Sequence, residues 1–524
     1  MFRMLFTTVA AAGIAAVSVA GAAELRIGLA SAPTSIDPHF HNSGPNSAFA
    51  RNVFEPLVKR GPALELEPGL ATSWTPLSDT EWEFTLREGG VFHNGAPFTA
   101  DDVIFSIERV PNVPDSPSSF GFAVAAIESI ERLDDHTLRL TTAAPAPNLP
   151  SDLSTFVIVS EAAGRDAQTA DYTRGDAMIG TGPVRFVSSR TGEVYELERF
   201  DDYWGGPSAW ERVSLRVISS EPARVAALLS GDVDLIERVP ATDVPRLEAN
   251  PDTVVWSGPT NRVAFISLDV EREEVQGNFA TDRQGRPLER NPMLDKRVRQ
   301  ALSYSINREQ LVERALGGDG VLTSNLVPVG FFGYNPNIPM PPYDPELSRQ
   351  LLAEAGFPDG FNMVFHTSSD RIDYAPRVVQ VLAQFWARIG INTQIELMPH
   401  SVYIPASNNF ELSYMMHSWG TGTGEASHTL NGIAVTRNRE AGTGGSNRGR
   451  YSNPRVDEIT EEARRTLDEA KRRALLEEAM AIVVGDYGII PLYAQRSSWA
   501  TRAGIDYIPQ VSQMTIASDA RPSD

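Results

Sequence analysis

In the last third of the chain, apolar residues recur with the two periods that distinguish strands from helices. Residues 361–365 follow a Pro-Asp-Gly turn and are apolar at alternate positions, and residues 391–397 alternate in the same way, which predicts two half-buried strands. Between them, apolar residues from Val378 to Ile389 have helical spacing, and Gly390 follows them as a helix stop signal. A strand, a helix and a second strand predict a parallel β-α-β unit.

A further strand is expected at residues 410–416, and it leads into a polar, glycine-rich loop at residues 417–425. In open parallel sheets, ligands bind in the crevice beyond the carboxyl ends of the strands. Two of the strand ends here are followed by ligand-type side chains, namely Arg371, Tyr374 and Trp419. This part of the chain therefore predicts one half of a binding cleft.

In the N-terminal half, a predicted strand again ends in a polar loop. Residues 25–29 predict a strand, residues 31–44 a polar loop with two prolines, and residues 49–57 an amphipathic helix. Residues 213–235 predict another β-α-β unit, with a helix that ends at Gly231. We expect the polar loop at residues 31–44 to line the same kind of cleft.

At 524 residues the chain is longer than one hydrophobic core usually serves, so we expect an α/β protein with at least two lobes. Crossings between the lobes are expected near Asp269 and near residues 488–490. Two crossings make a hinge, and a hinge between two lobes makes a cleft. The expected divisions are lobe I at residues 24–57, 185–268 and 490–524, an additional subdomain of lobe I at residues 58–184, and lobe II at residues 269–489.

The first residues have the pattern of an export signal. Arg3 precedes a largely apolar, uncharged run at residues 5–20, and small residues follow that suit a signal peptidase. We expect residues 1–23 to be a signal peptide and the mature chain to begin near Glu24. A membrane anchor is the weaker alternative, because the run is short and rich in alanine. No cysteine follows for a lipid anchor, so an exported, unanchored protein of the periplasm is expected.

Composition narrows the possible functions. A formal net charge of -21 argues against nucleic-acid binding, which needs clustered Lys and Arg. The absence of cysteine excludes disulfides, thiolate metal sites and a cysteine nucleophile. The chain has no G-x-S-x-G elbow, no H-E-x-x-H and no Walker loop, and no carboxylate cluster accompanies His39 and His41 as a metal site would require. We therefore expect no catalysis and no cofactor, with a secreted hydrolase of peptides or conjugates as the alternative.

Residues 67–103 carry the most specific sequence of the chain: EPGLATSW at 67–74, FTLREG at 84–89 and VFHNGAPFTADDV at 91–103. These segments resemble the extracytoplasmic solute-binding proteins of ABC importers, family 5, the peptide, dipeptide, nickel and opine type. Later segments resemble the same family in the same order, so the resemblance covers essentially the whole mature chain. They are GTGP at 180–183, YWGGP at 203–207, AALLSGDVD at 226–234, DKRVRQALSY at 295–304, YSNP at 451–454 and IIPLY at 489–493.

The resemblance implies a hinged, two-lobed fold of the periplasmic binding protein type. It also implies that a peptide-like or carboxylate-bearing solute is captured between the lobes and delivered to an inner-membrane ABC permease with its ATPase. We expect the protein to act as a monomer. An alternative function on the same fold is that of a ligand sensor, which would present its ligand to a signalling partner instead of a permease. A nickel chelate bound by His417 and His428 is a minor alternative.

The resemblance also indicates site residues. In dipeptide-binding relatives an Arg and a Tyr of one loop meet the carboxylate end of the ligand, which here implies Arg371 and Tyr374; a salt bridge of Arg371 to Asp370 or Asp373 is the structural alternative. Asn42 and Ser43 match loop positions that touch ligand backbone in relatives. The complete set of expected ligand-binding residues is Phe40, Asn42, Ser43, Arg371, Tyr374, His417, Trp419, Gly420 and Glu425.

One position departs from the family pattern. Peptide-binding relatives carry an Asp shortly after the Trp-x-Gly of this loop, and it pairs with the α-amino group of the ligand. Residues 419–425 have the sequence WGTGTGE, so that Asp is absent and Glu425 is the carboxylate that could replace it. Without such an anchor, ordinary peptides lose a buried charge pair. A modified peptide, an opine-like conjugate and another small polar solute all stay open as ligands.

Overall fold

The computed structural model describes residues 23–523 apart from four internal positions, which are Gln276, Asp370, Arg371 and Glu440. The expected signal peptide at residues 1–23 therefore lies almost entirely outside the described residues. Among the described helices, none combines the length and the apolar character that crossing a membrane requires.

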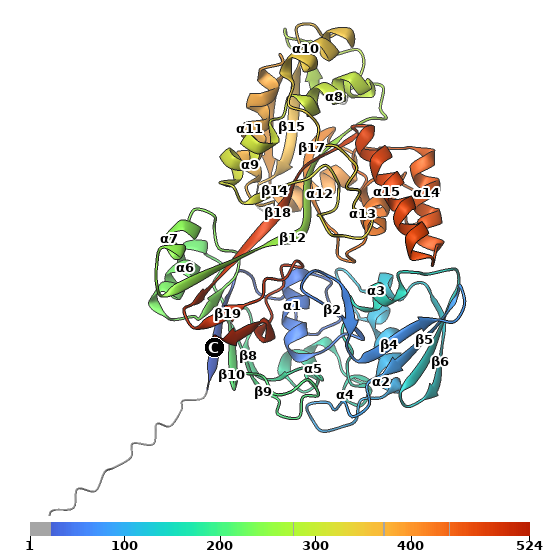
Figure 1. Ribbon diagram of the computed structural model, residues 1–524, viewed down its shortest axis with the longest axis vertical. Helices are drawn as coiled ribbons and strands as arrows, with labels where there is room; N and C mark the ends of the chain where they lie inside the picture. The colour runs from blue at the N-terminus through green and yellow to red at the C-terminus, as the bar shows by residue number, and fades with distance from the viewer. Residues whose placement is uncertain (1–22, 276, 370–371, 440, 524) are drawn as a thin grey trace, which may run out of the picture.

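The chain forms two lobes, drawn one above the other in Figure 1, and a pair of long strands runs through both. These strands are β12 (Thr253–Leu268) and β18 (Ile489–Arg502). They stand in the middle of one 12-stranded sheet with the order β13-β15-β17-β12-β18-β11-β1-β10-β9-β8, while β14 and β16 pair outside this path. The expected two-lobed α/β fold is confirmed, with one sheet shared by the lobes.

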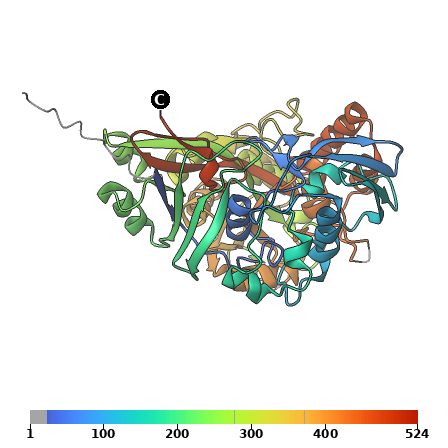
Figure 2. The same cartoon turned by 90° about the horizontal axis from the view of Figure 1, so that it is seen from below.

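Lobe I is built on three parallel strands, with β1 between β10 and β11. The expected β-α-β unit at residues 213–235 is present, and its helix ends at Gly231 with a φ of 78°, a conformation that favours glycine. Figure 2 shows the dark blue helix α1 between this sheet and the strands of the subdomain. The elements of lobe I are β1 (Glu24–Leu29), α1 (Gly44–Val53), α4 (Glu161–Gly164), α5 (Thr169–Arg174), β8 (Val184–Arg190), β9 (Val194–Arg199), β10 (Arg212–Val217), α6 (Glu221–Ser230), β11 (Leu235–Ile236), α7 (Val244–Glu248), β19 (Ile505–Tyr507) and β20 (Ala520–Pro522).

The subdomain has its own antiparallel sheet, in the order β4-β5-β7-β6, and its own apolar core. Its helix α2 begins with the expected cap, because the Thr99 amide donates to the Asp102 carboxylate at 2.9 Å. Val157 and Val159 belong to the core of lobe I, whereas Ile158 packs in the core of the subdomain, so the two cores meet in this segment, ahead of the expected boundary at residue 184. The elements of the subdomain are β2 (Val58–Arg60), β3 (Leu66–Pro68), β4 (Ala71–Pro76), β5 (Glu81–Leu86), α2 (Ala100–Arg109), β6 (Ile127–Asp134), β7 (Thr137–Thr142) and α3 (Leu149–Leu153).

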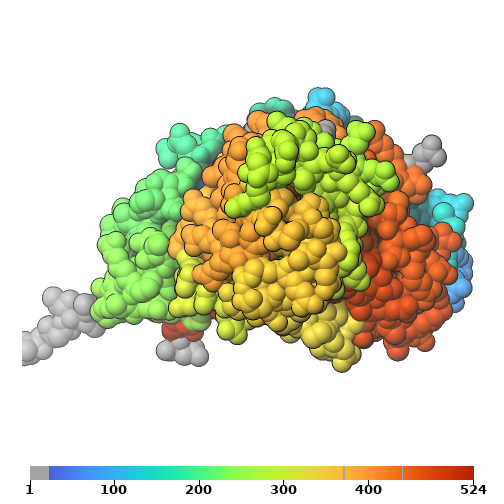
Figure 3. All heavy atoms as spheres, turned by 90° about the horizontal axis from the view of Figure 1, so that it is seen from above, coloured from blue at the N-terminus to red at the C-terminus, as the bar shows by residue number. Residues whose placement is uncertain are grey.

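Lobe II contains the expected parallel unit, in which β15 pairs with β16 across helix α11. Seen from above, lobe II covers most of the molecule in Figure 3, in yellow and orange. The strand expected at residues 410–416 instead spans Tyr414–Gly420, because its pairing with β12 extends to Gly420. The elements of lobe II are β13 (Ala280–Thr281), α8 (Lys296–Tyr304), α9 (Arg308–Leu316), β14 (Gly320–Leu322), α10 (Pro345–Glu354), β15 (Asn362–Ser368), α11 (Ala375–Ala387), β16 (Asn392–Met398), α12 (His400–Asn408), β17 (Tyr414–Gly420), α13 (Ala426–Ile433), α14 (Pro454–Arg465) and α15 (Glu469–Gly485).

The chain crosses between the lobes inside β12 and β18, and not at their ends. Residues 253–259 of β12 pair with the lobe I part of β18, whereas residues 262–268 pair with β17 of lobe II. A shift of register separates the two parts. The crossings predicted near Asp269 and residues 488–490 are therefore wrong by several residues, because each strand continues through the crossing without interruption.

Candidate functional site

The parallel strands of both lobes point their carboxyl ends at the crossing. In lobe I, β11 runs antiparallel to β18 and approaches the crossing as it ends at Ile236. In lobe II, β17 ends at Gly420 opposite Arg262, which lies in the crossing part of β12. The loops that follow these strands therefore face the space between the lobes, where ligands of such sheets bind.

The loop after β1 contributes Asn42 from lobe I. Its backbone amide donates to Ser118 of the subdomain at 2.8 Å, while its side chain is exposed. The Ser43 hydroxyl is already engaged, because it donates to the Asn46 side chain at 2.7 Å. Phe40 is half-buried in the same loop. Of the three residues expected to contact ligand from this loop, Asn42 is thus the one that is exposed.

Tyr374 connects the lobes from the side of lobe II. Its hydroxyl accepts a hydrogen bond from the Ala241 amide of lobe I at 3.2 Å, and burial raises the pKa of this hydroxyl to about 12. Its backbone φ of 60° lies in the left-handed region, a conformation that costs a bulky residue free energy and clusters at functional sites. Arg371 lies outside the described residues, so its expected role stays a prediction. Asp373 is one of the two carboxylates expected as alternative salt-bridge partners of Arg371. Its carboxylate lies 4.0 Å from the guanidinium of Arg238 of lobe I.

Trp419 lies at the end of β17 and is half-buried. Its ring packs on His428 with the centroids 5.4 Å apart, and burial lowers the pKa of His428 to about 4. The indole Nε1 and the His428 Nδ1 are buried with no hydrogen-bond partner among the described residues. Gly432 leaves the space for this ring, since a Cβ there would lie 2.7 Å from the indole. Neighbouring Gly420 is half-buried against Arg262.

His417 does not face the cleft. It is 3% exposed, and its Nδ1 lies 3.0 Å from the Tyr403 hydroxyl inside lobe II. Burial lowers its pKa well below the usual value, so the ring is neutral. β17 continues past this residue and turns its side chain into the lobe, so the structure gives no support to the predicted ligand contact of His417, which stays a prediction. Across the described part of the chain, no group of three or more His, Cys, Asp or Glu side chains could hold a metal ion.

Glu425 is also committed inside the protein. It is 7% exposed, accepts a hydrogen bond from Ser427 at 2.7 Å and lies 3.5 Å from the Arg472 guanidinium. A carboxylate held in this way must leave Arg472 and Ser427 before it can pair with the ammonium group of a ligand, so its expected role stays a prediction that these contacts do not favour. Gly422, three residues earlier, is exposed, and a Cβ there would meet nothing within 4 Å.

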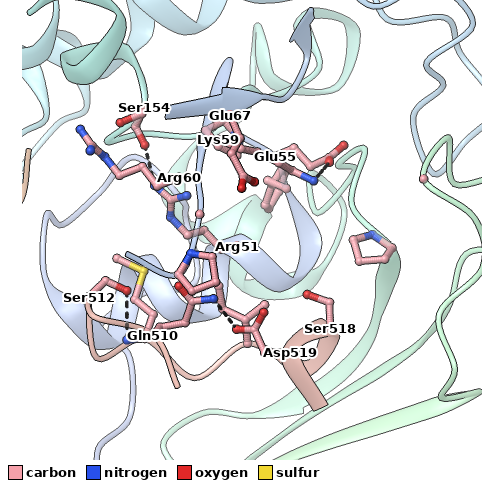
Figure 4. Close-up of a pocket in the computed structure, with 18 of the residues that line it drawn as sticks. Arg51, Glu55, Lys59, Arg60, Glu67, Ser154, Gln510, Ser512, Ser518 and Asp519 are labelled. Carbon is pink, nitrogen blue, oxygen red and sulfur yellow. Dashed lines mark hydrogen bonds and ion pairs between the residues drawn. The ribbon is translucent and has the colours of Figure 1, made fainter. Parts of the chain in front are cut away.

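A cavity of about 740 Å³ extends from the crossing along lobe I (Figure 4). It lies between α1, the β2–β3 hairpin and the C-terminal segment at residues 510–521, with Asn261 and Gly422 at the crossing end. Asn42 of the loop after β1 also lines it, so the cavity reaches the strand-end loops at Asn42 and Gly422, whereas Tyr374 and Trp419 are not among its lining residues.

Arg51 of α1 is a lining residue that the sequence pattern did not single out. Its Nη2 donates to the Ser154 carbonyl at 2.5 Å, and no carboxylate lies within ion-pair distance among the described residues. Burial lowers its pKa to about 10, so it stays protonated at neutral pH. Ser47 and Arg51 lie four residues apart on α1, and this polar face of an amphipathic helix was the available signal, while Glu55 follows the end of the helix at Val53.

Glu55 and Asp519, two carboxylates of the cavity wall, have partners within it. Glu55 pairs with Lys59 at 3.0 Å, and its carboxylate accepts hydrogen bonds from Tyr203 and Trp204. Asp519 accepts a hydrogen bond from Gln510 at 3.0 Å, and burial raises its pKa to about 7. Arg51 therefore provides positive charge in the cavity without a matching carboxylate.

The fold and this interlobe site define a class, the two-lobed solute-binding proteins. The profile of the bacterial extracellular solute-binding proteins, family 5, matches residues 65–440. The chain belongs to this family, and it is a non-enzymatic receptor of an ABC importer that works in the periplasm.

Individual comparisons extend over the full fold. Heme-binding protein A of Haemophilus influenzae is 28% identical over 490 residues, which cover 88% of this chain and 85% of that protein. Glutathione-binding protein GsiB of Pectobacterium atrosepticum is 27% identical over 501 residues, with 93% and 92% covered. The structure of the ABC transporter-associated periplasmic binding protein DppA of Helicobacter pylori, in complex with peptide STSA, has a TM-score of 0.74, 24% identity, and coverage of 96% and 98%.

Proposed function

We propose that the solute is anionic, carries a carboxylate and is recognised without a free α-amino group. The observation that supports this most is Arg51, whose guanidinium lines the cavity with a backbone carbonyl as its hydrogen-bond acceptor and no carboxylate nearby. A half-buried cation in this state gains from an anionic ligand, because a charge-assisted pair forms without displacing an existing one.

The loop after β17 supports the second half of the proposal. The carboxylate of Glu425 is engaged by Arg472 and Ser427, and Gly422 presents no side chain. This loop therefore offers no free carboxylate to an α-ammonium group. N-acylated peptides and opine-like conjugates fit such a site better than free peptides do.

The size of the site suits a peptide-like molecule. A volume of about 740 Å³ lies within the range of roughly 300–1,000 Å³ for small-molecule pockets. Relatives are named for binding heme, glutathione and dipeptides, and each of these molecules carries a carboxylate. One chain supplies the whole site, so we propose that a monomer delivers the solute to an inner-membrane permease with its ATPase.

Calorimetry with four related probes tests this proposal: Ala-Leu, N-acetyl-Ala-Leu and the C-terminal amide of each. We expect the N-acetyl acid to bind at least as tightly as the free dipeptide, and both amides to bind at least tenfold more weakly. An amide that binds as tightly as its acid would overturn the carboxylate proposal. Accumulation of cleaved probe, followed by mass spectrometry, would contradict a receptor role.

A further inference from the structure

The β2–β3 hairpin of the subdomain reaches across to lobe II. Leu64, in its turn, is 6% exposed and is buried in the same apolar cluster as Phe331, Ala426 and Leu430 of lobe II. A side chain of one lobe is thus part of the core of the other. In a hinged protein, such a contact must hold, slide or break whenever the lobes move.

Arg60 of the same hairpin forms the polar part of this contact. Its Nη1 donates to the Leu64 carbonyl at 2.8 Å and to the Thr423 carbonyl of lobe II at 2.9 Å. Its Nη2 donates to the Ser151 hydroxyl and carbonyl at 2.5 and 3.1 Å. Figure 4 shows the Arg60 side chain directed away from Gln510 and Asp519 on the opposite wall of the cavity.

The loop of lobe II is shaped to receive the hairpin. Gly424 has a φ of 70°, and a Cβ there would lie 3.3 Å from the Leu64 side chain, so this close approach favours glycine. A second contact lies beside it. In the amide orientation that satisfies both of its polar atoms, Asn148 of the subdomain donates to the Glu425 carboxylate at 3.0 Å.

Backbone hydrogen bonds link this contact to the crossing strands. The Val511 amide donates to Pro62 of the hairpin, the Asn261 amide donates to Val511, and the Thr421 amide donates to Asn261. The hairpin, the crossing and the loop after β17 therefore form one connected unit next to the hinge.

We propose that the β2–β3 hairpin is a non-covalent interlobe clasp, in which Leu64 and Arg60 position the 421–425 loop and restrict the lobes to a narrow range of separations. The clasp residues act on solute affinity through this loop and through closure. Because the loop carries Gly422 into the candidate site, a shift of the loop changes the site as well.

The cysteine-free sequence allows a test without ligand. Asp79→Cys in the subdomain and Gln350→Cys in lobe II are exposed positions for two spin labels, whose separation is measured by double electron-electron resonance. We expect Leu64→Ala and Arg60→Gln each to widen the distance distribution at least twofold, and Arg60→Lys to restore part of the narrow distribution. Leu66→Ala is the matched control, since Leu66 lies in the same hairpin but is 36% exposed.

An unchanged distribution in Arg60→Gln would overturn the proposal, even if Leu64→Ala fails to fold. A distribution that widens equally in Leu66→Ala would also overturn it, because the effect would then reflect general loosening of the hairpin. No solute is present in this measurement, so an error in the proposed solute class cannot change its outcome.

Discussion

The Glu425 carboxylate lies 3.5 Å from the Nε of Arg472, and both side chains are largely shielded from solvent. Because of this pair, Glu425 is not free in this structure to replace the Asp that is missing from the loop after β17. The sequence has a carboxylate three residues beyond Gly422, at Glu425, but in the fold this carboxylate is paired with Arg472 within lobe II. Recognition of a ligand ammonium group therefore needs a carboxylate that this loop does not supply.

Introducing that carboxylate should create a new specificity. Gly422→Asp places the side chain in open space at an exposed position without a positive φ, so the fold should tolerate it. A hydrogen bond to a charged group contributes about 1.5–3 kcal/mol, and we expect the affinity for Ala-Leu to rise roughly tenfold or more. Calorimetry would measure this, with Gly422→Asn as the uncharged control. No gain over that control would show that residue 422 does not face the ligand.

Removing Arg51 should weaken binding of a carboxylate ligand. Losing one side of a buried charged pair costs about 2–5 kcal/mol, which is roughly thirty-fold or more in affinity. Arg51→Gln should have little effect on the thermal stability of the ligand-free protein, because desolvation of an unpaired cation opposes its hydrogen bond to Ser154. Arg190→Gln, an exposed arginine paired with Glu193, is the control. Equal affinities of the Arg51 variant and the wild type for N-acetyl-Ala-Leu would refute the role of Arg51.

Arg371 remains the expected clamp from lobe II. Arg371→Ala should weaken binding of N-acetyl-Ala-Leu by the same factor, because arginine keeps its charge at any relevant pH and suits a carboxylate. If Arg371 instead pairs with a neighbouring surface carboxylate, the change in affinity should be small, since exposed pairs contribute little. The acid probe separates the two, and the amide is its control, because a clamp that acts on the carboxylate predicts weaker binding of the acid alone and equal binding of the amide to the variant and the wild type.

Acid should destabilise the protein below about pH 6.5. Burial lowers the pKa of His39 to about 3 and those of His93 and His428 to about 4, and it also lowers the pKa of His366 and, more strongly, that of His417. Unfolded histidine has a pKa near 6.5, so the unfolded chain binds more of these protons and stability falls as the pH falls from about 6.5 toward 4.

Buried carboxylates oppose this trend in part. Burial raises the pKa of Asp102 to about 6 and those of Asp152 and Asp519 to about 7, so these groups favour the folded state as the pH falls. Denaturant titrations between pH 4 and 7 should show the net loss of stability in acid. His39→Gln should reduce the slope by up to one proton, or about 1.4 kcal/mol per pH unit, whereas an unchanged slope would mean that His39 is charged in the fold.

Short-range hydrophobic patterns in the sequence were sufficient to predict individual helices and strands of the fold. The helix from Val378 to Ile389 and its flanking strands have clear periods, and Gly390 has the positive φ of a helix stop, 88°. The crossing within β12 has no such signal. The sequence of a strand does not indicate whether the neighbouring strand belongs to lobe I or to lobe II. The position of the crossing depends on where β12 begins to pair with β17 of lobe II.

The site was predicted less completely, because its properties depend on contacts between distant residues. Glu425 and Arg472 are 47 positions apart, and nothing near Glu425 in the sequence indicates that it is paired. His417 was expected in a loop, but pairing with Phe265 extends the strand and buries the ring. Arg51 was within reach of sequence reasoning, since it lies on the polar face of its helix.

The central claim is that the protein retains an anionic solute without converting it. Native mass spectrometry of gently purified protein tests this directly, because it reports the mass and stoichiometry of a retained ligand. We predict one ligand per chain that carries a carboxylate and has no free α-amino group, released unchanged on unfolding. A retained ligand without a carboxylate, or a free dipeptide bound through its ammonium group, would contradict the account.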